Sequence, residues 1–232
     1  MAYRDDLEAA QQRTQAAEAE AERLRSALEA ERKDRTVART EVAADRIFVG
    51  VTGHVLALSR DGGAELWRTK LSSGYPALVV VEWPDVYAAC HGELHRLAPG
   101  TGDIMWKNKM KGLGYQPMTI APVPRGLSGG NRVYVGMSGV VLALDKNTGK
   151  EVWRTEIATG AFLNVVLLGE EVLVGGAKGL ICLDARTGEE RWRNELPKLI
   201  AMLTVVTIGP ASVGQIATPM TAADVTMQMG GL

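Results

Sequence analysis

The sequence of 232 residues has few cysteines, few aromatic residues and no excess of either charge. Its two cysteines, Cys90 and Cys182, are too few to hold a chain of this length together, which indicates either a reducing compartment or no dependence on the redox state of the compartment. Lysine and arginine number 26 and aspartate and glutamate 27, so the net charge is −1. We therefore expect neither a disulfide-rich secreted domain nor a basic surface for nucleic acid or anionic lipid.

Long apolar runs are also missing. The longest, residues 199–208, is half as long as the roughly 20-residue helix that crosses a bilayer, and its composition is that of a strand. Residues 1–8 contain no apolar run of the kind found in signal peptides. We therefore expect no membrane span and a cytoplasmic protein.

Residues 1–45 differ in composition from the rest of the chain. They contain no glycine or proline and are rich in alanine, glutamate, arginine and glutamine, which predicts a long helix. Leu7, Leu24 and Leu28 fall on two heptad seams, but alanine and threonine occupy most of the other seam positions. The segment is consistent with a short coiled coil that sets the oligomeric state, and equally with a solvated single helix or part of a longer stalk.

The remaining chain is a tandem repeat marked by four tryptophans that are 39, 47 and 39 residues apart. A glycine lies four residues before each tryptophan. The tryptophans are Trp67, Trp106, Trp153 and Trp192, and the glycines are Gly63, Gly102, Gly149 and Gly188. A period near 40 residues with several short strands in each unit is typical of a β-propeller, in which each repeat forms one four-stranded blade.

The turn before each tryptophan has a recognisable chemistry. In the third repeat, Asp145 and Thr148 carry oxygens that can accept backbone N–H groups, and Gly149 can take positive φ. Asp184 occupies the equivalent position in the fourth repeat. We expect each indole to lie between neighbouring blades with its N–H bonded to a backbone carbonyl, so the motif is interpreted as structural.

The segments 144–153 and 183–192 resemble the tryptophan-docking motif of the pyrroloquinoline-quinone (PQQ)-like β-propeller repeat. The first two copies depart from the motif, because Ser59 and Ala98 replace its aspartate. The resemblance covers residues 46–208. It implies an all-β propeller of four four-stranded blades, preceded by the N-terminal helix. The family includes quinoprotein alcohol and glucose dehydrogenases, BamB-type assembly lipoproteins of the outer membrane, and binding propellers.

The position of the innermost strands suggests how the propeller closes. Candidate innermost strands precede repeats two, three and four at residues 77–82, 118–123 and 162–168, whereas none precedes repeat one. We predict that residues 199–208 supply this strand and complete the first blade, which covers sheet edges. The chain is then divided into a helix (1–45), a propeller (46–208) and a tail (209–232) that is either disordered or packed on the propeller or on a partner.

Four blades leave two alternatives for the assembly. PQQ-like propellers usually close with seven or eight blades, so two chains can build one eight-bladed ring, a homodimer in which each C-terminal strand completes the partner's first blade. The other alternative is a four-bladed monomer.

Residues suited to catalysis are scarce. Quinoprotein dehydrogenases with this repeat carry a vicinal cysteine pair, a calcium site and a catalytic aspartate, but Cys90 and Cys182 are far apart in sequence, so we expect no PQQ or other cofactor. Cys90, His91 and His95 form the only cluster of metal-ligand types, and strand alternation places the first two on opposite faces. We assign no catalytic, cofactor or metal residue. Arg125, beside the glycine-rich loop 126–131, is the candidate partner-binding residue.

These observations favour a non-enzymatic scaffold that presents loops to a protein partner, with the helix serving oligomerisation or tethering. The alternative is a small-ligand sensor or quinoprotein-related enzyme that uses the central channel. No nucleic-acid partner is expected.

Overall fold

The computed structural model describes residues 14–15, 17–31, 45–72, 76–124, 129–157, 163–177 and 179–196. The chain divides into two compact units, Met1–Arg46 and Ile47–Leu232. In the first unit, residues 14–15 and 17–31 are helical and exposed, with Leu24 61% and Leu28 54% accessible. The predicted helix is confirmed for these residues, whereas a coiled coil is not shown. None of the described helices is long and apolar enough to cross a membrane.

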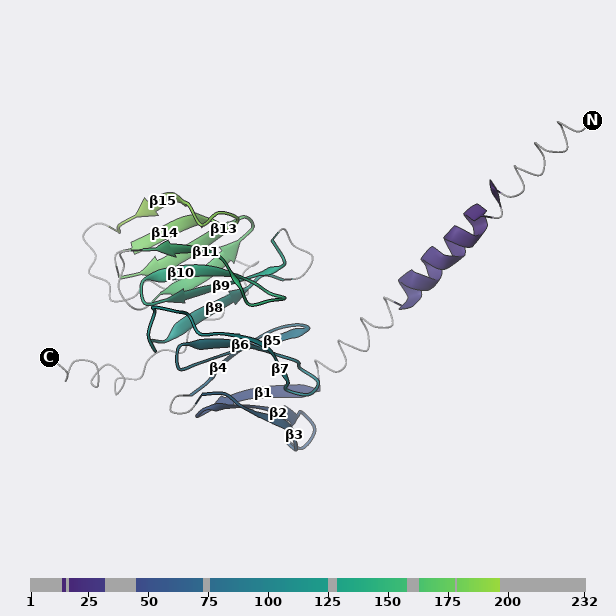
Figure 1. Ribbon diagram of the computed structural model, residues 1–232, viewed down its shortest axis with the longest axis horizontal. Coiled ribbons are helices and arrows are strands. Elements are labelled where there is room, and N and C mark those ends of the chain that lie inside the picture. The colour runs from purple at the N-terminus through teal and green to yellow at the C-terminus, as the bar shows by residue number, and fades with distance from the viewer. Residues whose placement is uncertain are drawn as a thin grey trace, which may run out of the picture. The chain divides into compact units, whose positions relative to one another are not determined.

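The second unit is built from four antiparallel sheets that follow one another along the chain and form the blades (Figure 1). Blade 1 contains β1 (Arg46–Val51), β2 (His54–Ser59) and β3 (Glu65–Lys70); blade 2 contains β4 (Leu78–Glu82), β5 (Asp85–Cys90), β6 (Glu93–Leu97) and β7 (Ile104–Asn108); blade 3 contains β8 (Met118–Pro122), β9 (Arg132–Met137), β10 (Val140–Asp145) and β11 (Glu151–Glu156); blade 4 contains β12 (Asn164–Leu168), β13 (Glu171–Gly176), β14 (Gly179–Asp184) and β15 (Glu190–Asn194). Each blade is a simple meander in which sequential strands pair. The expected four-bladed propeller fold is confirmed.

The same register shift recurs between the last two strands of every blade. In blade 3, Ala143 pairs with Trp153 but Leu144 pairs with Glu151, so Val152 is an extra residue on β11. Equivalent bulges occur in the other three blades. A bulge of this kind turns the extra side chain away from the ladder, and Val152 is 47% exposed beside the less exposed tryptophan.

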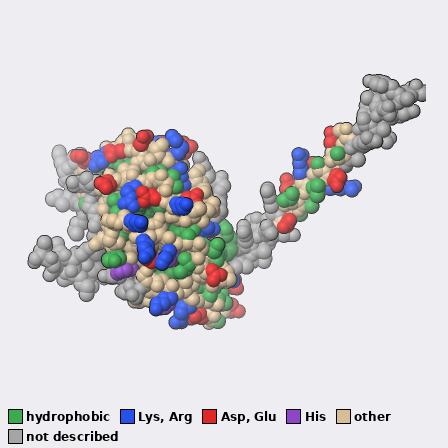
Figure 2. Space-filling view, in the orientation of Figure 1, with side chains coloured by type: hydrophobic (Ala, Val, Ile, Leu, Met, Phe, Trp, Pro, Cys, Tyr) green, Lys and Arg blue, Asp and Glu red, His purple; other side chains and the backbone are tan. Residues whose placement is uncertain are grey.

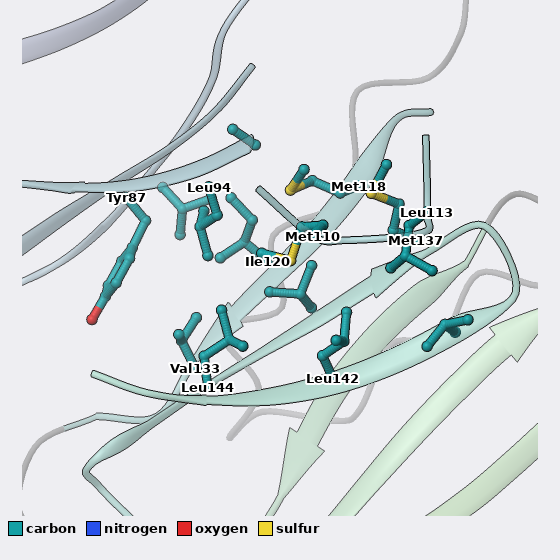
Figure 3. Packing of buried hydrophobic residues seen from close by; sticks show 14 of the residues in the cluster. Tyr87, Leu94, Met110, Leu113, Met118, Ile120, Val133, Met137, Leu142 and Leu144 are labelled. Carbon is teal, nitrogen blue, oxygen red and sulfur yellow. The ribbon is translucent and has the colours of Figure 1, made fainter. Parts of the chain in front are cut away.

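The apolar core is divided into three layers, one between each pair of successive blades. Strand alternation explains this arrangement, because successive side chains of β9 point to opposite faces. Val133 and Val135 pack toward blade 2, whereas Tyr134 packs toward blade 4. Figure 3 shows the layer between blades 2 and 3, to which Tyr87 and Leu94 of blade 2 and Val133 of blade 3 belong. Blades 2 and 3 are therefore each covered by a neighbouring blade on both faces.

The outer strands carry a repeated ion pair on either side of the tryptophan. The carboxylates of Glu65, Glu151 and Glu190 lie 2.7, 2.8 and 2.7 Å from the guanidinium three residues later, at Arg68, Arg154 and Arg193. Figure 2 accordingly shows basic and acidic side chains next to one another over the propeller. Exposed pairs of this kind add little stability, about 0–1 kcal/mol each. Their effect is to keep the rim polar and close to neutral.

Blade 1 differs from the others because it has three strands in the described part of the chain. Its β1 corresponds to β5, β9 and β13, so the missing member is the innermost strand. Residues 199–208, which are predicted to supply it, lie outside the described residues, as does the tail 209–232. That closure remains a prediction.

Candidate functional site: the interblade docking motif

The first three tryptophans each bond to the turn of the following blade. The indole Nε1 of Trp67 donates to the carbonyl of Pro99 at 3.0 Å, that of Trp106 to Lys146 at 2.7 Å, and that of Trp153 to Ala185 at 3.2 Å. All three acceptors occupy the same position of the repeat, two residues after Leu97, Leu144 and Leu183. A buried indole N–H usually needs such an acceptor. The tryptophans therefore join one blade to the next.

The glycine of each accepting turn lies against the tryptophan ring. At Gly149, φ is +68° and an added Cβ would lie 2.5 Å from Cε3 of Trp106. Gly102 and Gly188 approach Trp67 and Trp153 in the same way. Glycine is required at these positions by both the backbone conformation and the space.

A second bond, which sequence reasoning missed, joins the same two blades. Two residues after each docked tryptophan, a polar side chain donates to the carbonyl of the next blade's glycine. The donors and acceptors are Thr69 to Gly102 at 2.6 Å, Asn108 to Gly149 at 2.8 Å and Thr155 to Gly188 at 2.6 Å. The signal was present in the sequence, since threonine or asparagine follows all four tryptophans at this spacing.

The two predicted aspartates close their own turns. Oδ1 of Asp145 accepts the backbone N–H groups of Asn147 and Thr148 at 3.0 and 2.8 Å. Although burial acts to raise the pKa of Asp145, the hydrogen bonds, led by the Thr148 hydroxyl, together lower it. Asp184 has the same contacts and is also 2.6 Å from Arg191, which lowers its pKa.

In the first repeat, Ser59 keeps part of this turn despite the lost carboxylate. Its hydroxyl accepts the N–H of Asp61 at 3.2 Å. The backbone bonds also match those of the third repeat: Ser59 N–H to Ala64 at 2.7 Å and Gly63 N–H to Ser59 at 3.1 Å. The accepting turn of blade 1 is therefore formed.

Among the described residues, the docking motif has no interblade partner at either end of the blade series. Trp192 is 43% exposed, compared with 9% for Trp67 and 8% for Trp106. At Gly63, where φ is +70°, an added Cβ would meet no described atom within 4 Å. Blade 4 thus carries an undocked tryptophan, and blade 1 carries a turn without a tryptophan ring against it.

The face of blade 1 that points away from blade 2 is apolar, and in the described part of the chain its side chains are more exposed than their counterparts in the other blades. Ile47 on β1 is 46% exposed, whereas the residues at the same position of the other blades, Val86, Val133 and Val172, are all 0% exposed. Leu56 and Leu58 on β2 are only partly buried, although their counterparts in blades 2, 3 and 4 are buried. This face has the composition of an interblade layer without the neighbouring blade.

The cysteines and histidines do not form a metal centre. In the described ranges, no group of three or more His, Cys, Asp or Glu residues is arranged to hold a metal ion. Cys90 and Cys182 are buried and neither forms a disulfide. His91 stacks on Tyr115 with ring centroids 3.9 Å apart, while the buried His95 places Nε2 3.4 Å from Glu93.

Burial controls the ionisation of two of these groups. It lowers the pKa of His95 below the ordinary value of 6.5, against the opposing effect of Glu93. It raises the pKa of the Cys182 thiol to about 11. Both groups are therefore neutral at pH 7. Arg125, the candidate partner-binding residue, lies outside the described residues.

Comparisons with solved structures support the propeller fold. BamB from Moraxella catarrhalis matches 66% of this chain and 50% of its own length, at 20% identity and a TM-score of 0.52. The computationally designed Ika8 protein matches 71% of this chain and 50% of its own length, at 18% identity and a TM-score of 0.54. Sqt1 from Saccharomyces cerevisiae matches 62% of this chain and 42% of its own length, at 13% identity and a TM-score of 0.51. The chain thus spans half the length of the first two proteins.

A search of curated proteins finds no match. Residues 90–218, more than half of the chain, match the family model described as outer membrane protein assembly factor BamB. Together with the docking turns, this match shows that the chain belongs to the BamB family of PQQ-like repeat proteins.

Proposed function

We propose that this chain is a non-enzymatic protein-binding scaffold that binds protein through the uncovered faces at the two ends of its blade series. The observation that carries the proposal is the exposure of Ile47 and Trp192, whose counterparts in the other blades are buried or largely buried by a neighbouring blade. Apolar side chains at such positions gain free energy when protein covers them, at about 25 cal/mol per Å² of apolar area. A face of this kind is typical of protein-interaction sites.

Two further features support the proposal. The matching family model is described as an assembly factor, which is a protein-binding role in the proteins so named. The helix in residues 1–45 exposes Leu24 and Leu28, and we propose that it serves oligomerisation or tethering. Because neither cysteine forms a disulfide, we also propose a cytoplasmic location.

Affinity capture with point variants tests the scaffold. The full tagged chain is expressed in its host, captured proteins are identified, and each one is purified and titrated against the chain by calorimetry. We expect a direct partner, which includes untagged copies of the chain itself, whose binding is weakened by Ile47→Ser or Trp192→Ser. Met105→Ser is the matched control, because Met105 is 57% exposed on an outer strand but belongs to neither end face.

A catalytic or sensor role predicts a different result. If PQQ with calcium raises the thermal unfolding midpoint by several degrees, the chain binds this cofactor and the proposed function is wrong. It is also wrong if no captured protein binds the purified chain directly.

A further inference from the structure

We propose that the protein bound by these end faces is a second copy of this chain. Blade 4 of each copy docks on blade 1 of the other, through the contacts that join blades within one chain. The inference rests on the proposed function, because it names the partner of the same two faces. The result is one closed ring of eight blades with two equal junctions between the copies.

Blade 4 supplies the donor side of the junction. Its Trp192 corresponds to Trp106, and its Asn194 corresponds to Asn108, which donates to a glycine carbonyl of the next blade. The backbone around Asn194 is already arranged in the same way. Its Oδ1 accepts the N–H of Leu196 at 2.9 Å, as Oδ1 of Asn108 accepts that of Met110 at 2.8 Å. The amide is thus oriented by the same local bond before any blade is docked.

Blade 1 supplies the acceptor side. By position in the turn, the carbonyl of Arg60 corresponds to those of Pro99, Lys146 and Ala185, which accept the three docked indoles. The carbonyl of Gly63 corresponds to those that accept the second bond. The open space at Gly63 is where the other turns hold a tryptophan ring. Trp192 of one copy therefore fits the blade 1 turn of the other.

The surfaces around these bonds also match, because both are apolar. On blade 4, Leu180 is partly buried, although its counterparts Val55, Leu94 and Val141 are 0% exposed. On blade 1, Ile47 faces outward in the same way. Each of the three internal layers pairs apolar side chains from two blades, and these two faces are the remaining halves of such a layer.

A second copy fits better than closure within one chain. Figure 1 shows blades 1 and 4 at the two ends of the series, and within the described residues Ile47 and Trp192 stay exposed and no atom lies within 4 Å of a Cβ added at Gly63.

The test uses light scattering and sedimentation of the full chain. We expect a species of twice the 24.9 kDa chain mass. Trp192→Ala should raise the dimer dissociation constant roughly 30-fold or more, as expected for a central tryptophan in an interface. Gly63→Ala should have an effect of the same kind, because its methyl group takes the place of the partner's indole.

Gly62→Ala is the matched control for the glycine variant. Both glycines have positive φ, +82° and +70°, and at both positions an added Cβ meets no described atom within 4 Å, so the backbone strain is similar. The counterpart of Gly62 in the other repeats is a threonine, whose hydroxyl bonds to an aspartate of its own turn. We expect Gly62→Ala to leave the dissociation constant unchanged within about twofold.

Mixing the two defective variants distinguishes this junction from dimerisation through the helix. A mixed dimer of Trp192→Ala and Gly63→Ala chains has one junction in which both changes meet and one that is entirely wild type. We therefore expect mixing to restore dimers that neither variant forms alone at the same concentration. Dimers that persist in both single variants, or that mixing does not restore, would overturn the inference.

The two proposals fail in different ways. A wild-type chain that stays monomeric at tens of micromolar, but still binds another purified protein in a Trp192-dependent manner, refutes the ring and leaves the scaffold intact. A monomer that binds no protein refutes both.

Discussion

Replacing Gly149 with alanine tests whether the glycine of the docking turn is needed for contact with the tryptophan or only for the bend of the chain. The φ of +68° costs an alanine about 1–2 kcal/mol, of which about 0.4–1 kcal/mol is offset because alanine restricts the unfolded chain. The new Cβ would also lie 2.5 Å from Cε3 and 2.6 Å from Cδ2 of Trp106. That ring cannot easily retreat, since its Nε1 is bonded to Lys146 and it packs against Tyr87.

Overpacking of this kind costs about 1–3 kcal/mol, so the total loss for Gly149→Ala is about 2–4 kcal/mol. For a domain of this size the unfolding midpoint should fall by roughly 4–16 °C. Gly112→Ala is the control, because φ is +84° there and an added Cβ meets nothing within 4 Å among the described residues. It should cost about 1 kcal/mol, or roughly 2–4 °C.

Thermal and urea unfolding followed by circular dichroism, at one protein concentration, measures both variants. An m-value that stays constant shows that the change lies in stability and not in the compactness of either state. Equal losses for Gly149→Ala and Gly112→Ala would mean that the ring contact adds nothing, and the proposed role of the glycine in docking would be wrong.

Three further predictions concern two buried side chains, His95 and Cys182, and the strand predicted at 199–208. Burial lowers the pKa of His95 in the folded chain, so as the pH falls the unfolded chain binds a proton near pH 6.5 and the folded chain binds it at a lower pH. The free energy of unfolding should therefore fall as the pH is lowered below 6.5. His95→Leu, which introduces the residue that repeats one and three carry there, should remove this fall; an unchanged pH profile in urea unfolding would contradict it. Cys182 is 0% exposed and its pKa is about 11, so a thiol reagent at pH 7.5 should label it only after unfolding, and rapid labelling of the native protein would refute this. A chain that ends at Leu196 lacks the strand predicted at 199–208, so the amides of β1 should exchange hydrogen faster while those of β9 keep their rates; unchanged exchange in β1 would exclude that strand as its partner.

Much of the fold could be predicted from the sequence because the informative residues act locally. The innermost strands expected at 77–82 and 118–123 correspond to β4 and β8. Glycine, aspartate and threonine in a turn determine backbone geometry within a few residues, so their spacing is visible without a structure.

Lys146 shows where sequence reasoning stops. A lysine in a turn is expected in solvent, yet this one is 0% exposed. Its Nζ lies 2.8 Å from Oε2 of Glu82, a residue of the preceding blade, and also donates to the carbonyl of Val123. The partners are 64 and 23 residues away in the chain, so no pattern among neighbouring residues predicts these contacts.

The tryptophans also separate what the sequence determines from what only the tertiary structure decides. The sequence by itself determined that four equivalent copies exist, each preceded by a glycine turn, because the repeat registers them at regular intervals. Only the tertiary structure decided that Trp67 and Trp106 are docked and that Trp192 is exposed, since the burial of an indole depends on whether another blade follows it in space. Likewise, Gly63 and Gly149 are both glycines with positive φ, but among the described residues only Gly149 lies against a tryptophan ring, that of Trp106. The sequence thus specified the contacts, and the position of each blade in the series decided which of them are made within one chain.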